Sequence, residues 1–154
     1  MPDPVIHDTF VLERDYPKTP AAVFAALSEP ALKRRWFADS PNHDIQDFTM
    51  DFRVGGRENL SYRFTGEAPI KGMILTNDTV FQDIVPDQRV VTTSVMTLGN
   101  KRITAALMTF ELRATATGTR LTCTHQAVYF EGADGPQMRR GGWEFLLDTL
   151  GKTL

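Results

Sequence analysis

The sequence predicts an α+β protein in which a strongly curved antiparallel sheet is closed by one long C-terminal helix. Six runs with strand character follow one another between residues 48 and 129, and short turn signals separate them. Connections this short join antiparallel strands, because parallel neighbours need a long crossover. One more strand run and two short helical patterns precede the six, and the only long helical pattern of the chain follows them.

The bulk properties are those of one ordinary globular domain, which we expect over residues 1–154. A net charge of −2 gives no electrostatic footprint for nucleic acid or an acidic membrane. The single cysteine, Cys123, excludes an internal disulfide and fits a reducing compartment. No apolar run approaches the roughly 20 residues of a membrane span, and the first residues lack a signal-peptide pattern. We therefore expect a cytoplasmic protein that neither inserts into membranes nor binds nucleic acid.

The first strand run covers residues 9–16, where apolar and charged residues alternate. Phe10, Leu12 and Tyr16 share one face of this strand. Arg14 lies on the same apolar face, so we expect it either to line a cavity or to pair with a carboxylate.

Two short helices follow the first strand in tandem. Thr19 offers a hydroxyl N-cap and Pro20 fits the first helical position, which predicts a helix that ends near Leu27. A second helix begins at Pro30 and ends near Trp36. Two short helices directly after one strand are a distinctive arrangement.

The long sheet region starts after a polar loop that we expect at residues 38–47. Turn signals such as Gly55-Gly56 and Thr117-Gly118 divide this region into strands. The six strand runs cover about residues 48–54, 57–65, 70–83, 89–97, 102–114 and 119–129.

The last pattern runs from Gly135 to Leu154 and has a helical period, with a polar stripe opposite a wide apolar arc. An arc of this width indicates a helix that lies along a concave sheet. The polar stripe consists of Arg140, Glu144, Asp148 and Lys152, and the apolar arc of Met138, Phe145, Leu146, Thr149 and Leu150 with Trp143 and Leu147 on its flank. Gly141 and Gly142 each cost about 1 kcal/mol inside a helix. We expect a close approach to the backbone there, a bend, or a helix that begins later.

Five segments in this order resemble the activator-of-Hsp90-ATPase-like (AHSA1-like) branch of the START-related, Bet v 1-like superfamily, also called SRPBCC. The resemblance covers about residues 9–154. The segments are TPAAVFAALSEPALKRRWF (19–37), DFRVGGRE (51–58), FQDIVPDQRVV (81–91), GTRLTCTHQ (118–126) and GGWEFLLDTL (141–150).

The resemblance implies the helix-grip fold, in which the sheet wraps the C-terminal helix and leaves a cavity between them. Members of the superfamily use that cavity for lipids, sterols, plant hormones and aromatic polyketides, and some are cyclases or aromatases. The branch takes its name from a eukaryotic co-chaperone in which this domain follows a separate domain. This chain has no room for that second domain, so we do not expect Hsp90 as a partner.

Three polar residues are candidates for the cavity: Arg14, Tyr62 and His125. His125 shares a predicted strand face with Cys123, where it either orients a ligand carbonyl, acts as a general base, or is a hydrogen-bonded histidine without chemistry. Tyr62 offers either a cavity hydroxyl or ordinary sheet packing. The apolar candidates either line a pocket or fill a core, and are Met73, Phe81, Met96, Met108, Phe110, Trp143 and Leu147.

Other chemistries find little support in the sequence. There is no GxSxG, P-loop or GxGxxG motif. The loop residues His43, Asp44, Asp47 and Asp51 lack the spacing of metal ligands. We therefore predict no catalytic set, no metal and no cofactor.

Two further features favour structural interpretations. The basic residues Lys33, Arg34 and Arg35 are expected on a solvated helix face. Cys123 is expected to pack as a small apolar side chain, because a nucleophilic thiol needs an activating neighbour and only His125 is near.

Three hypotheses for function follow. The first is a binding module whose apolar cavity takes a lipid-like or aromatic small molecule. The second is a polyketide cyclase or aromatase-like enzyme that uses the polar residues of the cavity. The third is a protein-interaction role, either as a chaperone partner or as a homodimer through the outer face of the sheet.

Overall fold

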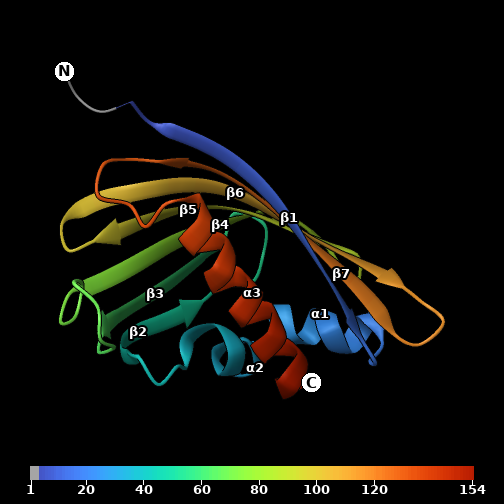
Figure 1. Cartoon of the computed structure of the whole chain (residues 1–154). Coiled ribbons are helices and arrows are strands. Elements are labelled where there is room, and N and C mark those ends of the chain that lie inside the picture. The colour runs from blue at the N-terminus through green and yellow to red at the C-terminus, as the bar shows by residue number, and fades with distance from the viewer. Residues whose placement is uncertain (1–3) are drawn as a thin grey trace.

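The computed structural model describes residues 4–154 and contains one seven-stranded antiparallel sheet in the order β1-β7-β6-β5-β4-β3-β2. Strands β2 to β7 are neighbours in chain order, and β1 is added at the far edge beside β7. The sheet curves strongly, and the C-terminal helix lies across its concave side (Figure 1). The strands are β1 (Ile6–Tyr16), β2 (His43–Met50), β3 (Arg57–Phe64), β4 (Ile74–Val85), β5 (Arg89–Leu98), β6 (Lys101–Ala114) and β7 (Thr119–Tyr129).

Three short helical segments join β1 to β2: α1 (Pro20–Ser28), α2 (Pro30–Lys33) and the π-helical turn η1 (Arg34–Ala38). The predicted cap of α1 is present, since the backbone N–H of Ala22 donates to Oγ1 of Thr19 over 3.2 Å. The long helix α3 (Pro136–Thr153) packs against η1 and β1. The predicted order of one strand, two short helices, six strands and one long helix is therefore confirmed, and the architecture is the helix-grip fold.

The predicted polar loop at residues 38–47 is wrong, because β2 begins at His43 and ends at Met50. A bulge between Ile45 and Asp47 inserts one extra residue into this strand. The bulge breaks the alternation of period two by which a strand is recognised in a sequence. Residues 51–54, predicted as strand, form the turn before β3 instead.

The two mid-helix glycines of α3 do not mark a bend, a late start or a close contact, because α3 runs without interruption from Pro136 to Thr153. A Cβ atom built at Gly141 or at Gly142 meets no atom of the described residues within 4 Å. The close approach occurs in the last turn of the helix. There a Cβ at Gly151 would lie 2.9 Å from Cε1 of Tyr16, whose hydroxyl donates to the carbonyl oxygen of Leu147 over 2.7 Å.

The buried stripe of α3 also differs from the predicted apolar arc. Met138 and Phe145, placed inside by the sequence pattern, are 69% and 59% exposed. The buried side chains recur at helical spacing along one face and are Arg139, Trp143, Leu147 and Leu150. An arginine opens this stripe, and a hydrophobic pattern does not place an arginine inside.

Candidate functional site

A row of four cross-strand neighbours lies on the concave face of the sheet, on the side covered by α3. The strand register pairs Asn77 with Met96, Met96 with Thr104, and Thr104 with Tyr129, so the row crosses β4, β5, β6 and β7. With neighbouring strands about 4.8 Å apart, the row spans about 14 Å.

Arg139 reaches from α3 onto this row. Its Nε and Nη2 atoms donate to the two carboxylate oxygens of Asp134 over 2.8 and 2.6 Å, which makes a bidentate pair. Nη1 also donates to Oγ1 of Thr104 over 3.2 Å, and Nη2 contacts the sulfur of Met96 at 3.4 Å. The guanidinium carbon lies 5.4 Å from the centre of the Tyr129 ring. The side chain of Arg139 is only 9% exposed, so these contacts hold it as an interior group.

Three buried polar atoms on the same face have no hydrogen-bond partner among the described residues: Oδ1 of Asn77, Nδ1 of His125 and the hydroxyl oxygen of Tyr129. An unpartnered buried polar group costs about 1–3 kcal/mol. Buried polar groups in folded proteins are almost always satisfied by protein, by ordered water or by a ligand. The concave face therefore presents unused hydrogen-bonding capacity at both ends of the row.

His125 is buried on β7, and its ring stacks on that of Phe10 with 4.6 Å between ring centres and 8° between planes. Burial, and secondly the positive charge of Arg139, lower the pKa of His125 from 6.5 to about 4. The imidazole is therefore neutral at pH 7. A base with a pKa of about 4 takes up protons poorly near neutral pH.

Tyr62 faces the concave side of the sheet from β3 and is half-buried. Burial raises the pKa of its phenol. The ring stacks on His43 of β2 with 3.7 Å between ring centres, and Nδ1 of His43 lies 2.9 Å from the carbonyl oxygen of Ala38. A carbonyl only accepts, so Nδ1 carries the proton. Arg14, by contrast, pairs with Asp148 on α3 over 2.7 Å, which is the second of its two predicted environments.

The apolar candidates divide into two groups. The larger group, fully buried in the continuous core, comprises Phe81, Met108, Phe110, Trp143 and Leu147. Met96 is half-buried and touches Arg139. Met73 does not lie in the interior: it is 39% exposed, stands in the turn before β4, and its methyl group lies 3.8 Å from the position of a Cβ built at Gly99.

The side chains of the concave face differ in how far they are exposed to solvent. Small and polar side chains in the middle of the sheet, Asn77, Ser94 and Ala106, are half-buried, although their neighbours on β7 are fully buried. Trp36 and Trp143, near η1, are also buried and tilt against each other at 6.5 Å. The aromatic half of the interior is thus packed core, and so are Thr104 and Tyr129 beside Arg139, whereas the part around Asn77, Ser94 and Met96 is the accessible one.

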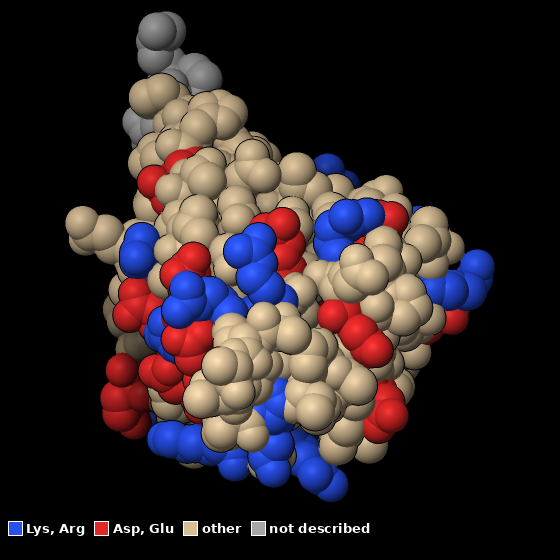
Figure 2. All heavy atoms as spheres, turned by 90° about the vertical axis from the view of Figure 1, so that its right-hand side faces the viewer, with Lys and Arg blue, Asp and Glu red and all other residues tan. Residues whose placement is uncertain are grey.

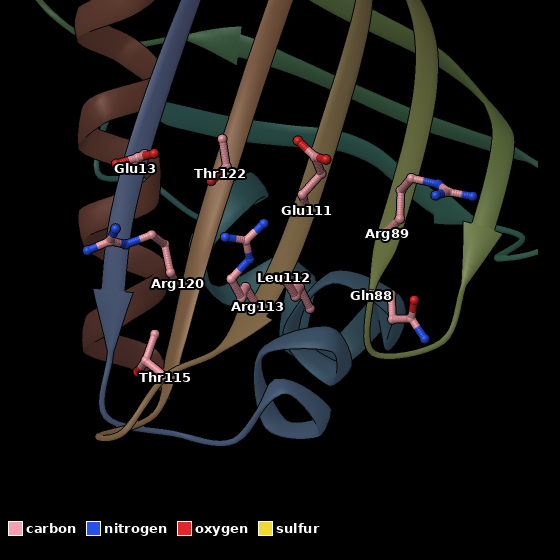
Figure 3. Close-up of a pocket in the computed structure, with 9 residues that line it drawn as sticks. All are labelled: Glu13, Gln88, Arg89, Glu111, Leu112, Arg113, Thr115, Arg120 and Thr122. Atoms are coloured by element: carbon pink, nitrogen blue, oxygen red, sulfur yellow. The ribbon is translucent and has the colours of Figure 1, made fainter.

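Two hollows of the described surface lie outside this interior. One, of about 380 Å³, is on the face of the sheet away from α3 and is lined mainly by polar side chains (Figure 3). Two of its three arginines are already paired, Arg120 with Asp15 and Arg89 with Asp83. The other, of about 530 Å³, lies between the start of α1 and the β6–β7 turn. On the side of the molecule shown in Figure 2, blue and red side chains are interspersed over most of the surface, and blue ones stand together along the lower edge.

A buried ion pair was missed by the sequence interpretation. Lys33, predicted on a solvated helix face, is buried, and its Nζ lies 2.5 Å from Oε1 of the buried Glu58 on β3. The same ammonium lies 4.7 Å from the centre of the Phe37 ring. Arg34 and Arg35 are exposed as predicted. The signal in the sequence was the helical spacing of Lys33 with the buried Trp36 and Phe37.

Two other chemistries were tested on the geometry. Burial raises the pKa of the Cys123 thiol to about 12, which leaves it protonated and unreactive at neutral pH. Within residues 4–154 there is no group of three or more His, Cys, Asp or Glu side chains arranged to hold a metal ion. No helix of the same residues is both long and apolar enough to cross a membrane.

The comparison with protein families decides the assignment. The model of the activator of Hsp90 ATPase homolog 1-like family matches residues 17–154. The chain belongs to this family. The resemblance seen in the sequence is thereby confirmed, and the AHSA1-like fold is in general that of a ligand- or cofactor-binding domain.

Solved structures agree with membership of the AHSA1-like family. A protein from Rhizobium loti is 40% identical with a TM-score of 0.87, and covers 99% of this chain and 100% of its own. An uncharacterized protein from Rhizobium leguminosarum is 35% identical with a TM-score of 0.90 and coverage of 97% and 95%. An AHSA1-like protein from Aeromonas hydrophila shares the fold at 18% identity and a TM-score of 0.63, with coverage of 95% and 91%. No protein with a curated description matches the chain.

Proposed function

We propose that this protein binds a small molecule with an apolar body, lipid-like or aromatic, between the concave face of the sheet and α3. The accessible part of the interior, around Asn77, Ser94 and Met96, is the binding region, and Arg139 contacts it through Met96. The ligand's apolar body lies against half-buried side chains such as Tyr62 and Met96, and its polar part faces the row from Asn77 to Tyr129. Pockets that combine an apolar wall with a few convergent polar groups are typical small-molecule sites.

The observation that carries the proposal is the set of three unpartnered buried atoms on Asn77, His125 and Tyr129. At about 1–3 kcal/mol each, they would together cost about 3–9 kcal/mol if nothing satisfied them. That sum is comparable to the whole stability of a domain, about 5–15 kcal/mol. A guest molecule that bonds to some of them recovers part of this cost, which supports a binding site here.

Binding, rather than catalysis, is the activity that these groups support. His125 has a pKa of about 4, and burial raises the pKa of the phenols of Tyr62 and Tyr129. None of these groups is poised to exchange a proton near pH 7. Cys123 is held as a protonated thiol. The residues of the site therefore donate and accept hydrogen bonds without a ready general base or nucleophile, which gives a cyclase-like reaction no support.

Native mass spectrometry of the protein purified from its own host tests the proposal. We expect a co-purified small molecule whose mass is lost when the protein is denatured. A second arm measures displacement of an uncharged apolar fluorescent dye, N-phenyl-1-naphthylamine, by the extracted molecule. Thr122→Val on the outer face of β7 is the control variant and should bind as the wild type does. A protein with neither a co-purified mass nor saturable dye binding would contradict the proposal.

A further inference from the structure

Arg139, the cation that reaches the row of the candidate site from α3, is already neutralised. Arg139 donates two parallel hydrogen bonds to Asp134, from Nε and from Nη2. Its remaining contacts are to neutral groups, the hydroxyl of Thr104, the sulfur of Met96 and the ring of Tyr129. A ligand in this place therefore meets an arginine whose positive charge is matched by a carboxylate.

The atoms that the protein leaves free are also uncharged. Asn77 offers an amide oxygen, Tyr129 a phenol whose pKa is raised by burial, and His125 an imidazole that is neutral at pH 7. The bonds to described residues use one Nη1 hydrogen of Arg139 and leave the second for an acceptor. A ligand is thus offered neutral donors and acceptors.

A carboxylate fits this arrangement badly. It brings a buried negative charge without a free positive partner, and it lies near the carboxylate of Asp134. A carboxylate also only accepts hydrogen bonds, so it leaves Oδ1 of Asn77, an acceptor on the accessible part of the row, without a donor. A hydroxyl or a primary amide both donates and accepts.

We propose that the site selects uncharged ligands that carry a hydroxyl or amide N–H for Asn77, and that the Asp134–Arg139 pair excludes carboxylates. This inference rests on the proposed function, because it names the ligand class of the same site. Asp134 sets the selectivity through Arg139, because its carboxylate neutralises the charge of that guanidinium.

A series of probes that share one apolar body separates small-molecule binding from selection against carboxylates. The probes are naphthalene, 2-naphthol and 2-naphthoate. Each is titrated at pH 7.5, and binding is followed by the fluorescence of Trp143 and Trp36. The second series, 1-decanol against decanoate, tests a lipid-like body. We expect the wild type to bind each neutral alcohol at least about tenfold more tightly than the matching carboxylate, a difference of about 1.4 kcal/mol.

Two variants test the residues behind this selectivity. Asp134→Asn frees the charge of Arg139 and is expected to raise the affinity for 2-naphthoate about tenfold or more, which abolishes the preference for 2-naphthol. Asp148→Asn is the matched control, because it removes a carboxylate that pairs with Arg14 on the exposed part of α3, and it should leave the preference unchanged. Asn77→Leu is expected to weaken 2-naphthol several-fold and to change naphthalene less than about twofold.

The outcomes distinguish the inference from the function on which it rests. If no probe of either series binds, the proposed function fails and the inference fails with it. If the wild type binds 2-naphthoate as tightly as 2-naphthol, small-molecule binding stands and the inference is overturned. Should Asp134→Asn not fold, as judged by circular dichroism, the Asn77→Leu series decides, and equal losses for 2-naphthol and naphthalene overturn the role of Asn77.

Discussion

Replacement by alanine should stabilise the protein at two glycines of α3 and destabilise it at a third. Gly141 and Gly142 are exposed in the helix interior, and an added Cβ meets no described atom within 4 Å. Each Gly→Ala change there should recover the difference in helix propensity, about 1 kcal/mol. For a chain of this length 1 kcal/mol raises the melting temperature by about 2–4 °C, so the double variant should gain about 4–8 °C.

Gly151→Ala is the contrasting case within the same helix. Its Cβ would lie 2.9 Å from Cε1 and 3.3 Å from Cδ1 of Tyr16, so the buried ring has to move. That movement disturbs the hydrogen bond from Tyr16 to the carbonyl oxygen of Leu147. Overpacking of this kind costs about 1–3 kcal/mol, which outweighs the gain in helix propensity.

Urea unfolding followed by far-UV circular dichroism measures all three variants under one set of conditions. We expect the midpoint to rise for Gly141→Ala and Gly142→Ala and to fall for Gly151→Ala, with unchanged slopes. A stabilised Gly151→Ala would refute the close packing of α3 on β1. Destabilised Gly141→Ala or Gly142→Ala would refute the open surroundings of the middle of the helix.

Three further predictions concern buried ionisable groups. Glu58→Ala should destabilise the protein by about 3–5 kcal/mol, because it leaves the buried Lys33 ammonium unpaired, and the double variant Lys33→Met with Glu58→Leu should recover most of the loss in urea unfolding. His125 has a folded-state pKa of about 4, below its unfolded value of 6.5, so protons favour the unfolded chain and stability should fall by about 3 kcal/mol as the pH drops from 6.5 to 4. His125→Gln should remove this part of the pH dependence. Cys123 should resist alkylation by iodoacetamide at pH 8 in the native protein and react at once in urea.

Each of these predictions has a contrary result. A Glu58→Ala variant as stable as the wild type would show that Lys33 reaches water. An identical pH profile for wild type and His125→Gln, after subtraction of the common carboxylate titration, would place the histidine in a hydrated setting. Alkylation of Cys123 at equal rates with and without urea would mean that the sheet opens around it.

The order of the helices and strands could be predicted from the sequence because local residue signals mark where each of them begins or ends. The hydroxyl of Thr19 and the ring of Pro20 start α1, and glycine turns end the strands. The first half of β2 was missed because its bulge shifts Phe48 out of alternation with Ile45. A bulge depends on pairing with the neighbouring strand, so the residues of β2 alone do not predict it.

The site was only partly readable. Tyr62, Met96 and His125 could be named because strand parity puts them on the concave face. Asn77 and Arg139 were not named, since a polar residue in a strand and an arginine in a helix are ordinarily assigned to solvent. Signals were present for both residues. Asn77 shares parity with the buried Leu75 and Thr79, and Arg139 stands four residues before Trp143 on the buried stripe.

A binding site between the sheet and α3 is tested most directly by an NMR titration of the wild-type protein with 2-naphthol, in which the side-chain signals of Asn77 and Arg139 are observed. We expect saturable shifts of the Asn77 amide and the Arg139 Nε–H together with intermolecular NOEs to Met96. Shifts confined to the outer hollow, at Arg113 and Thr122, or no shifts at saturating 2-naphthol, would contradict a binding site between the sheet and α3.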